Sequence, residues 1–199
     1  MRTDTTTVVL CGVGGQGALL AADILARCAM ACGHDVKLSE IHGMAQRGGA
    51  VTTVVRLGEK VSSMVADRGS ADFLVSFETT EALRNLPFLR EDGCMIVSDE
   101  SIKPLPVLTG KAAMPQRARA RLAEAGGLIV PASLLAKQAG SARAVNIVLL
   151  GVLSTRLAYP EDVWTRVIEQ RVPPKFKQAN IAAFAAGRAF GRAHVSKGE

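Results

Sequence analysis

Residues 12–17 read Gly-Val-Gly-Gly-Gln-Gly and have the types and spacing of a phosphate-binding loop. In such a loop the first glycine permits a tight turn, the second lets the backbone approach a diphosphate, and the third lets the next helix pack on the strand. The helix that follows offers free N–H groups and partial positive charge to an anion. The pattern therefore predicts a phosphate-bearing ligand held by Gly12, Gly14, Gly15, Gln16 and Gly17, chiefly through backbone N–H groups. The alternative is a purely structural turn.

Glu40 is a candidate for holding the ribose of a dinucleotide. Dinucleotide-binding folds place an acidic residue about 20 positions beyond the glycine loop, where it binds the ribose hydroxyls. Glu40 has this place at the end of an expected strand. It could equally be an ordinary carboxylate at a strand end.

A second motif, residues 40–49, reads Glu-Ile-His-Gly-Met-Ala-Gln-Arg-Gly-Gly and is rich in glycine and polar groups. It follows the second expected strand, so we expect it at the carboxyl edge of the sheet, where open α/β sheets bind ligands. Gln46 can donate a hydrogen bond, and Arg47 can clamp a phosphate or carboxylate. His42 could act as an acid or base, although a single histidine is more often a structural hydrogen-bonding group. The sequence indicates no catalytic residue and no metal ligand.

The glycine loop must be positioned by the elements around it. A β-branched run at 6–11 predicts a buried strand, and residues 18–32 have apolar residues at helical spacing. With a second strand at 36–41, these segments form a Rossmann-like βαβ unit. Further strands are expected at 50–57, 61–65 (returning antiparallel), 73–77, 95–98 and 128–130. Further helices are expected at 79–89, 116–125 and 145–157, and after Pro160 and Pro174.

The alternation of strands and helices predicts an α/β fold. We expect one domain over residues 1–199, with a single doubly wound, mostly parallel sheet and a helical C-terminal cap. Residues 102–115 contain three prolines and are expected to be irregular.

Composition limits the classes of function. The net charge of +6 favours anionic partners such as phosphates or acidic proteins. The basic residues are scattered and have no interleaved aromatic side chains, so we do not expect nucleic acid binding. No run of about 18 apolar residues occurs, and the polar start lacks a signal layout, so we expect a cytoplasmic protein with no membrane span.

Four cysteines occur, at positions 11, 28, 32 and 94. We interpret them as small buried side chains in a reducing compartment. Ferredoxin-type clusters need closely spaced Cys-x-x-Cys repeats, which are absent, so we expect no iron–sulfur cluster on this chain.

Taken together, the motifs resemble the gamma domain of pyruvate and other 2-oxoacid:ferredoxin oxidoreductases. The resemblance rests on residues 12–17 and 40–49 and extends to residues 71–78, 81–84 and 146–151. It continues through Pro174-Lys175-Phe176, Asn180, Ala183-Phe184 and Gly187, and it is weakest between residues 102 and 126. The length and the form of the second motif look most like the separate small (beta) subunit of the indolepyruvate enzymes.

The resemblance implies a function in a complex. Enzymes of this family decarboxylate a 2-oxoacid on thiamine diphosphate, pass electrons through iron–sulfur clusters to ferredoxin, and transfer the acyl group to coenzyme A. It implies that thiamine diphosphate and the clusters belong to a larger partner subunit. The gamma domain would help to bind coenzyme A and cover the active site, with Gln46 and Arg47 near the ligand or the partner. Indolepyruvate, phenylpyruvate, branched-chain and pyruvate substrates stay open.

Two other functions are consistent with the residues. The first is a free-standing NAD(P)-dependent oxidoreductase, although no clear catalytic set accompanies Tyr159, the only tyrosine. The second is a non-catalytic structural subunit, in which the glycine loop only packs.

Overall fold

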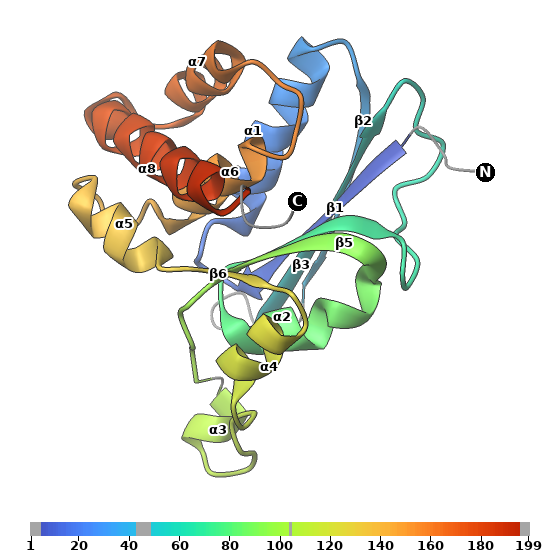
Figure 1. Cartoon of the computed structure of the whole chain (residues 1–199), viewed down its shortest axis with the longest axis vertical. Helices are drawn as coiled ribbons and strands as arrows, with labels where there is room; N and C mark the ends of the chain where they lie inside the picture. The colour runs from blue at the N-terminus through green and yellow to red at the C-terminus, as the bar shows by residue number, and fades with distance from the viewer. Residues whose placement is uncertain (1–4, 43–48, 104, 196–199) are drawn as a thin grey trace.

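The computed structural model describes residues 5–42, 49–103 and 105–195. Its centre is a sheet of six strands in the order β2-β3-β1-β4-β5-β6 (Figure 1). The strands are β1 (Thr5–Val13), β2 (Asp35–His42), β3 (Ala50–Gly58), β4 (Ala71–Ser76), β5 (Leu89–Ser98) and β6 (Leu128–Val130). The prediction of one mostly parallel sheet is confirmed, because β1, β4, β5 and β6 pair in parallel.

The first strand–helix–strand unit differs from a Rossmann unit in one respect. The helix α1 (Ala18–Ala31) follows β1 as expected, and β2 runs in the same direction as β1. However, β3 lies between them and is antiparallel to both. The antiparallel β3 therefore separates the two strands that a Rossmann unit would pair side by side.

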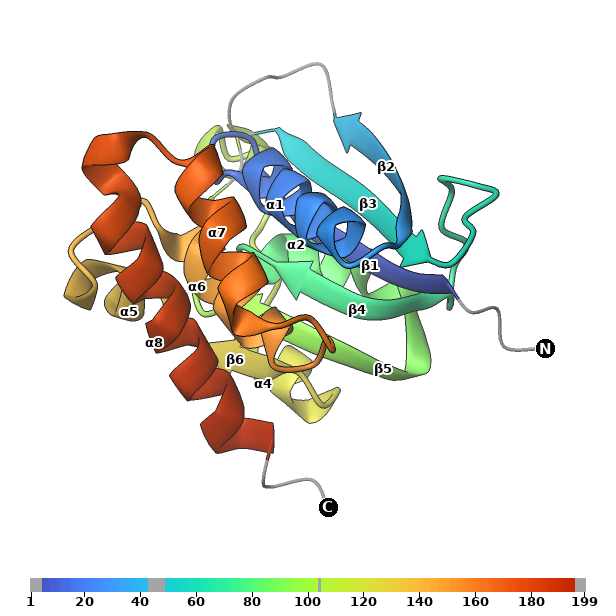
Figure 2. The same ribbon diagram turned by 90° about the horizontal axis from the view of Figure 1, so that it is seen from above.

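Helices cover both faces of the sheet, as the doubly wound prediction requires. One face carries α1, α5 (Ala132–Gln138), α6 (Val145–Ser154), α7 (Glu161–Arg171) and α8 (Lys177–Val195), while α2 (Thr79–Asn85) and α4 (Ala118–Glu124) lie on the other (Figure 1). Figure 2 shows α1 along β1 and β3, with α7 beside α1 and α8 on the other side of α7. Alternate residues of β1 enter the two cores: Val8 and Leu10 face the first group of helices, and Val9 faces the second.

The C-terminal cap is held by two closely packed helices. α6 is buried on almost all sides, as its composition predicted. It meets α8 at Gly151 and Gly187, where a Cβ atom on either glycine would overlap a backbone carbonyl of the other helix. The short 3-10 turn η2 (Pro174–Phe176) leads into α8.

Two predictions of secondary structure need correction. Residues 61–65 form no strand, because side chains bind their backbone: Asp35 accepts from the Val61 N–H at 2.9 Å, and Arg56 donates to the carbonyls of Ser63 and Val65 at 3.1 Å. In addition, α5 was not predicted. It is seven residues long and buries only Ala132 and Ala136, so its sequence carries little periodic signal.

The remaining elements are small. The expected helix at 79–89 ends earlier, at Asn85, and continues as the 3-10 turn η1 (Leu86–Phe88) into β5. The proline-containing segment holds the short α3 (Leu105–Leu108) and is otherwise irregular as expected. None of the described helices is both long and apolar enough to cross a membrane.

Candidate functional site

The glycine loop connects the carboxyl end of β1 to the start of α1, as predicted. Two of its residues have left-handed backbone conformations, Gly15 with φ 102° and Gly17 with φ 81°. Gly17 is the N-cap of α1 and provides no side-chain cap to the helix. The first-turn amides of α1 therefore lack the usual side-chain oxygen and are suited to an anion from outside the loop.

Gln16 fastens the loop to the neighbouring strand. Its Oε1 accepts from the Val13 N–H at 2.8 Å, and its Nε2 donates to the Phe77 carbonyl at 3.1 Å. A Cβ atom on Gly12 would lie 2.6 Å from this Oε1. The expected role of Gly12 in a tight turn is thus wrong: Gly12 lies within β1 and makes room for the Gln16 side chain.

Fewer loop amides are open to a ligand than the sequence predicted. The Gly14 N–H donates to the Gly49 carbonyl at 2.8 Å, and the Gln16 N–H donates to the Val13 carbonyl at 3.2 Å. Within the described ranges, the amides of Gly15 and Gly17 make no hydrogen bond. The expectation of a ligand held by backbone amides is therefore narrowed to Gly15, Gly17 and the first turn of α1.

The loop lines one wall of a cavity of about 210 Å³. The opposite wall comes from the connection before α6 and from the segment that leads into α8. Its polar side chains are Ser141, Arg143, Asn146 and Asn180, and the exposed Phe176 also lines it. Arg143 is exposed and forms no ion pair or hydrogen bond with any residue that the structure describes. The cavity therefore combines open amides with an uncompensated guanidinium, which suits a phosphate or carboxylate.

Asn146 fixes the distance between the two walls. Its Nδ2 donates to the Gly17 carbonyl at 3.2 Å, and its Oδ1 accepts from the Ile147 N–H at 3.0 Å. A Cβ atom on Gly17 would lie 2.6 Å from this Nδ2, so Gly17 permits the contact with α6 rather than the expected packing on the strand. On the other side, Asn180 donates to the Phe176 carbonyl at 2.8 Å.

Sequence reasoning missed Arg143 as a site residue and gave Asn146 and Asn180 no role in binding. Asn146 lies 129 residues from Gly17 in the chain, so only the folded structure shows their contact. Arg143 stands between Ala142 and Ala144 with no local motif around it. A search for basic residues just before a buried helix could have singled it out.

The structure does not bring Glu40 to the glycine loop. Glu40 pairs with Thr53 on β3, and Thr53 pairs with Leu10 on β1. Glu40 therefore lies two strand spacings, or about 10 Å, from β1, the strand that leads into the glycine loop. The insertion of β3 is the physical reason. Gln46 and Arg47 lie outside the described residues. His42 ends β2 and is exposed.

The second motif nevertheless ends beside the first. The hydrogen bond from the Gly14 N–H to the Gly49 carbonyl joins the two glycine-rich segments. The expected arrangement, with the second motif at the carboxyl edge of the sheet next to the first loop, is confirmed at this residue.

Two buried carboxylates lie at the end of β4, close to the segment that Gln16 binds. Glu78 caps α2 by accepting from the amides of Thr80, at 2.9 Å, and of Glu81. Burial raises the pKa of Glu81, Arg84 lowers it, and the nearby Glu78 raises it further. Glu78 therefore holds the start of α2 in place, and neither carboxylate belongs to the lining of the cavity.

The cysteines are free thiols, and two of them are deeply buried. Burial raises the pKa of Cys11 to about 12 and that of Cys28 to about 12. Both thiols are therefore protonated at neutral pH, as expected for small core side chains. Among the described residues, no group of three or more His, Cys, Asp or Glu side chains is placed to hold a metal ion.

Comparison with known proteins places the chain in a family. The family model described as pyruvate ferredoxin/flavodoxin oxidoreductase matches residues 7–190. The chain is 37% identical over 187 residues to the indolepyruvate oxidoreductase subunit IorB of Thermococcus kodakarensis, covering 90% of this chain and 93% of that protein. It is 35% identical over 186 residues to the subunit of the same name from Archaeoglobus fulgidus, covering 90% and 92%.

Solved structures share the fold. A gamma subunit of a keto/oxoacid ferredoxin oxidoreductase from Geobacter sulfurreducens superimposes with a TM-score of 0.71 at 23% identity, over 94% of this chain and 99% of that one. A 2-oxoglutarate:ferredoxin oxidoreductase from Magnetococcus marinus, solved with 2-oxoglutarate, coenzyme A and succinyl-CoA bound, gives a TM-score of 0.73 at 20% identity. That match covers 96% of this chain and 32% of the longer one. From the sequence match and the shared fold together, the chain belongs to the pyruvate ferredoxin/flavodoxin oxidoreductase family.

Proposed function

We propose that this chain is the gamma-type small subunit of a 2-oxoacid:ferredoxin oxidoreductase, with indolepyruvate as the first substrate to test. The observation that carries the proposal is the similarity to subunits named IorB over about nine-tenths of both chains. We treat the chain as one gamma-type domain, in line with a family match that runs through residues 7–190 without a break.

In this proposal the larger partner subunit carries thiamine diphosphate and the iron–sulfur clusters, and ferredoxin accepts the electrons. Coenzyme A takes the acyl group. This chain contributes binding and orientation rather than the bond-breaking chemistry, which belongs to the cofactor.

We further propose that the cavity beside the glycine loop receives a phosphate group of coenzyme A. The amides of Gly15 and Gly17 and the guanidinium of Arg143 supply complementary charge. The volume of about 210 Å³ is below the roughly 300–1,000 Å³ of pockets that enclose a whole drug-sized ligand, so the cavity fits one end of the molecule. Gln46 and Arg47, predicted from the sequence, would add contacts from the second motif, whereas Glu40 would need a ligand that reaches two strands further.

The test is reconstitution with the larger subunit. The pair should reduce ferredoxin when supplied with indolepyruvate and coenzyme A, and neither subunit should do so alone. An active lone chain, or a chain that binds NAD or NADP in calorimetry and turns over a substrate by itself, would favour the free-standing oxidoreductase instead.

The role of Arg143 is tested in the same complex. We expect Arg143→Ala to raise the KM for coenzyme A by about 10- to 100-fold, the effect of losing one charged contact of about 1.5–3 kcal/mol. Arg166→Ala on α7 is the matched control, because Arg166 is an exposed arginine that pairs with Asp162 away from the cavity. An unchanged KM in Arg143→Ala would remove this residue from the site and leave the subunit assignment intact.

A further inference from the structure

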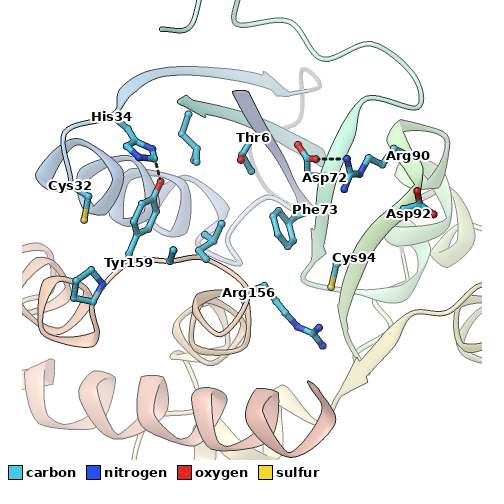
Figure 3. A pocket seen from close by; sticks show the side chains of 14 residues that line it. Thr6, Cys32, His34, Asp72, Phe73, Arg90, Asp92, Cys94, Arg156 and Tyr159 are labelled. Atoms are coloured by element: carbon cyan, nitrogen blue, oxygen red, sulfur yellow. Dashed lines mark hydrogen bonds and ion pairs between the residues drawn. The ribbon is translucent and has the colours of Figure 1, made fainter. Parts of the chain in front are cut away.

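A second and larger cavity has a volume of about 690 Å³ (Figure 3). Its lining includes Thr6, so it lies at the opposite end of β1 from the glycine loop. It lies on the face covered by α1 and α6, where β1, β4 and the connection between α6 and α7 come together. Thr6 at the start of β1 marks its position, and Gly12 is six residues further, about 20 Å along the strand. Nothing in the proposed coenzyme A contact uses this cavity.

The body of the cavity is apolar. Leu57 and Phe73 on the sheet face Leu157 and Ala158 on the connection after α6. Phe73 and Leu157 are only partly buried, so each offers surface to a ligand. A flat apolar group could therefore lie against the Phe73 ring, as aromatic side chains prefer.

One side of the cavity carries a cation without a counter-charge. Arg156 is exposed, and its side chain forms no hydrogen bond or ion pair with any residue that the structure describes. The side chain lies on the same side as Cys94 in Figure 3. Burial raises the pKa of Cys94, while the charge of Arg156 lowers it, which agrees with a guanidinium that lies near Cys94 in the lining. A guanidinium binds a carboxylate through two parallel hydrogen bonds.

The other charged groups of the lining do not neutralise Arg156. Asp72 is held by Arg90 at 3.0 Å and by the Thr7 N–H at 2.8 Å. Asp92 is exposed on β5 and forms no ion pair with Arg156. The lining therefore has two charged side chains without a partner among the described residues, the exposed Arg156 and the exposed Asp92, and of these only Arg156 can bind an anion.

The far side carries a polar pair. Tyr159 and His34 are joined by a hydrogen bond of 3.1 Å between the phenol oxygen and Nδ1 (Figure 3). The Tyr159 ring also lies 6.1 Å from Trp164, which stacks on Phe184 at 5.8 Å. A ligand that touches Tyr159 is therefore within reach of the single tryptophan of the chain.

We propose that this cavity binds a small organic monocarboxylate with a planar apolar body. The carboxylate pairs with Arg156, the body packs against Phe73 and Leu157, and the far end meets Tyr159. The volume matches the roughly 300–1,000 Å³ of pockets for small ligands, and such pockets combine apolar walls with a few polar groups. A single free guanidinium favours a monoanion over a diphosphate, which needs several donors.

The test uses the full chain and phenylacetate as the probe, followed by calorimetry and by the fluorescence of Trp164. Phenylacetate should bind saturably, and phenylacetamide, which has the same shape and no charge, should bind at least about tenfold more weakly. Arg156→Gln should weaken phenylacetate binding by about 10- to 100-fold, the range for one charged hydrogen bond. Tyr159→Phe should weaken it by a few-fold and reduce the fluorescence change.

Two controls locate the binding. Arg166→Gln removes an exposed arginine outside the cavity, and Arg143→Ala removes the guanidinium beside the glycine loop; both should leave phenylacetate binding unchanged. Circular dichroism confirms that each variant is folded. No saturable binding, equal affinity for the amide, or loss of binding in Arg143→Ala but not in Arg156→Gln would overturn the proposal without touching the coenzyme A assignment.

Discussion

At the scale of single residues, Gln16 explains much of the glycine loop. Its carboxamide accepts from Val13 at the end of β1 and donates to Phe77 just after β4. The side chain thus bridges the two neighbouring strands at the point where their backbone pairing ends. Gly12 lacks a Cβ because the carboxamide needs that space. Hydrogen bonds within the protein therefore fix the conformation of the loop without a ligand.

Gly17 should be more sensitive to substitution than Gly15. Both have positive φ, so alanine is strained at either position, by about 1 kcal/mol or more. At Gly17 the new Cβ would also press on the Asn146 side chain, whereas at Gly15 nothing lies within 4 Å. We expect Gly17→Ala to lower the midpoint of thermal unfolding clearly more than Gly15→Ala does, as measured by calorimetry. Equal losses would mean that the contact with α6 adds nothing to the backbone strain.

Glu81 should make the protein less stable as the pH rises. Burial raises its pKa above the ordinary value of 4.5, so above that pH the folded state holds more protons than the unfolded state. The stability that the protonated Glu81 contributes is complete below pH 4.5, and it is lost as the pH rises through the raised pKa of the folded state. The Oε2 atom of Glu81 is buried and accepts no hydrogen bond within the described ranges, so ionising this carboxyl group in the folded state is more unfavourable still.

We therefore expect Glu81→Gln to gain stability relative to the native protein as the pH rises from about 4.5 to 7. Urea unfolding at a series of pH values measures the difference. Glu169→Gln, on the exposed surface of α7, is the control and should show no such trend. A difference that stays constant with pH would show that Glu81 titrates normally.

At this scale the sequence predicted the glycine loop and its neighbour well, because both are local patterns. It could not predict which amides stay open, since that depends on Gly49 and on the inward turn of Gln16. Arg143 joins the site through tertiary structure alone. The contacts of Gln46 and Arg47 stay predictions.

At the scale of elements, the contact between α6 and α8 holds the helical cap together. The two helices touch backbone to backbone at Gly151 and Gly187, and the stacked rings of Trp164 and Phe184 extend the contact to α7. Close approach of this kind needs residues without side chains at the crossing. The crossing of α6 and α8 therefore depends on these two glycines.

Gly187→Ala should destabilise the fold more than Gly191→Ala. At Gly187 the added Cβ would overlap the Val148 carbonyl, which is backbone and cannot turn away. At Gly191 it would meet mainly the side chain of Thr155, at 2.9 Å, which can move. Overpacking of this kind costs about 1–3 kcal/mol. Denaturant unfolding of the two variants compares them directly, and a larger loss for Gly191→Ala would contradict the packing described here.

The sequence predicted those elements correctly in which a clear pattern of apolar residues extends over many positions. The strands at the centre of the sheet and the helices α1, α6 and α8 lie close to where the pattern put them. It failed at 61–65, where a strand was expected to return antiparallel after residue 60 but Asp35 and Arg56 bind the backbone instead. Register and the order of strands depend on distant pairing, so the position of β3 could not be read locally.

At the scale of the whole molecule, the sheet separates two unequal cores. The face under α1, α6 and α8 buries most of the apolar side chains, whereas the face under α2 and α4 has a smaller cluster. α4 contributes one buried residue, Leu122, while nearly all of α6 is buried. The two faces should therefore differ in local stability.

We expect the amides of α4 to exchange with solvent much faster than those of α6. Few buried contacts hold α4, so it can open without unfolding the sheet. Hydrogen exchange followed by mass spectrometry measures both helices in one sample, and α1 on the larger core is an internal control. Protection of α4 equal to that of α6 would show that the molecule opens only as a whole.

The antiparallel placement of β3 has a consequence for how such a protein can diversify. The chain leaves the sheet at His42 and re-enters it by Ala50 at the same edge, next to the glycine loop. Residues can be added or removed between these points without shifting any strand, because both strands are held by their own pairing. A lineage can therefore vary the connection between β2 and β3 to suit a new substrate or a new companion chain, and the paired strands need not change.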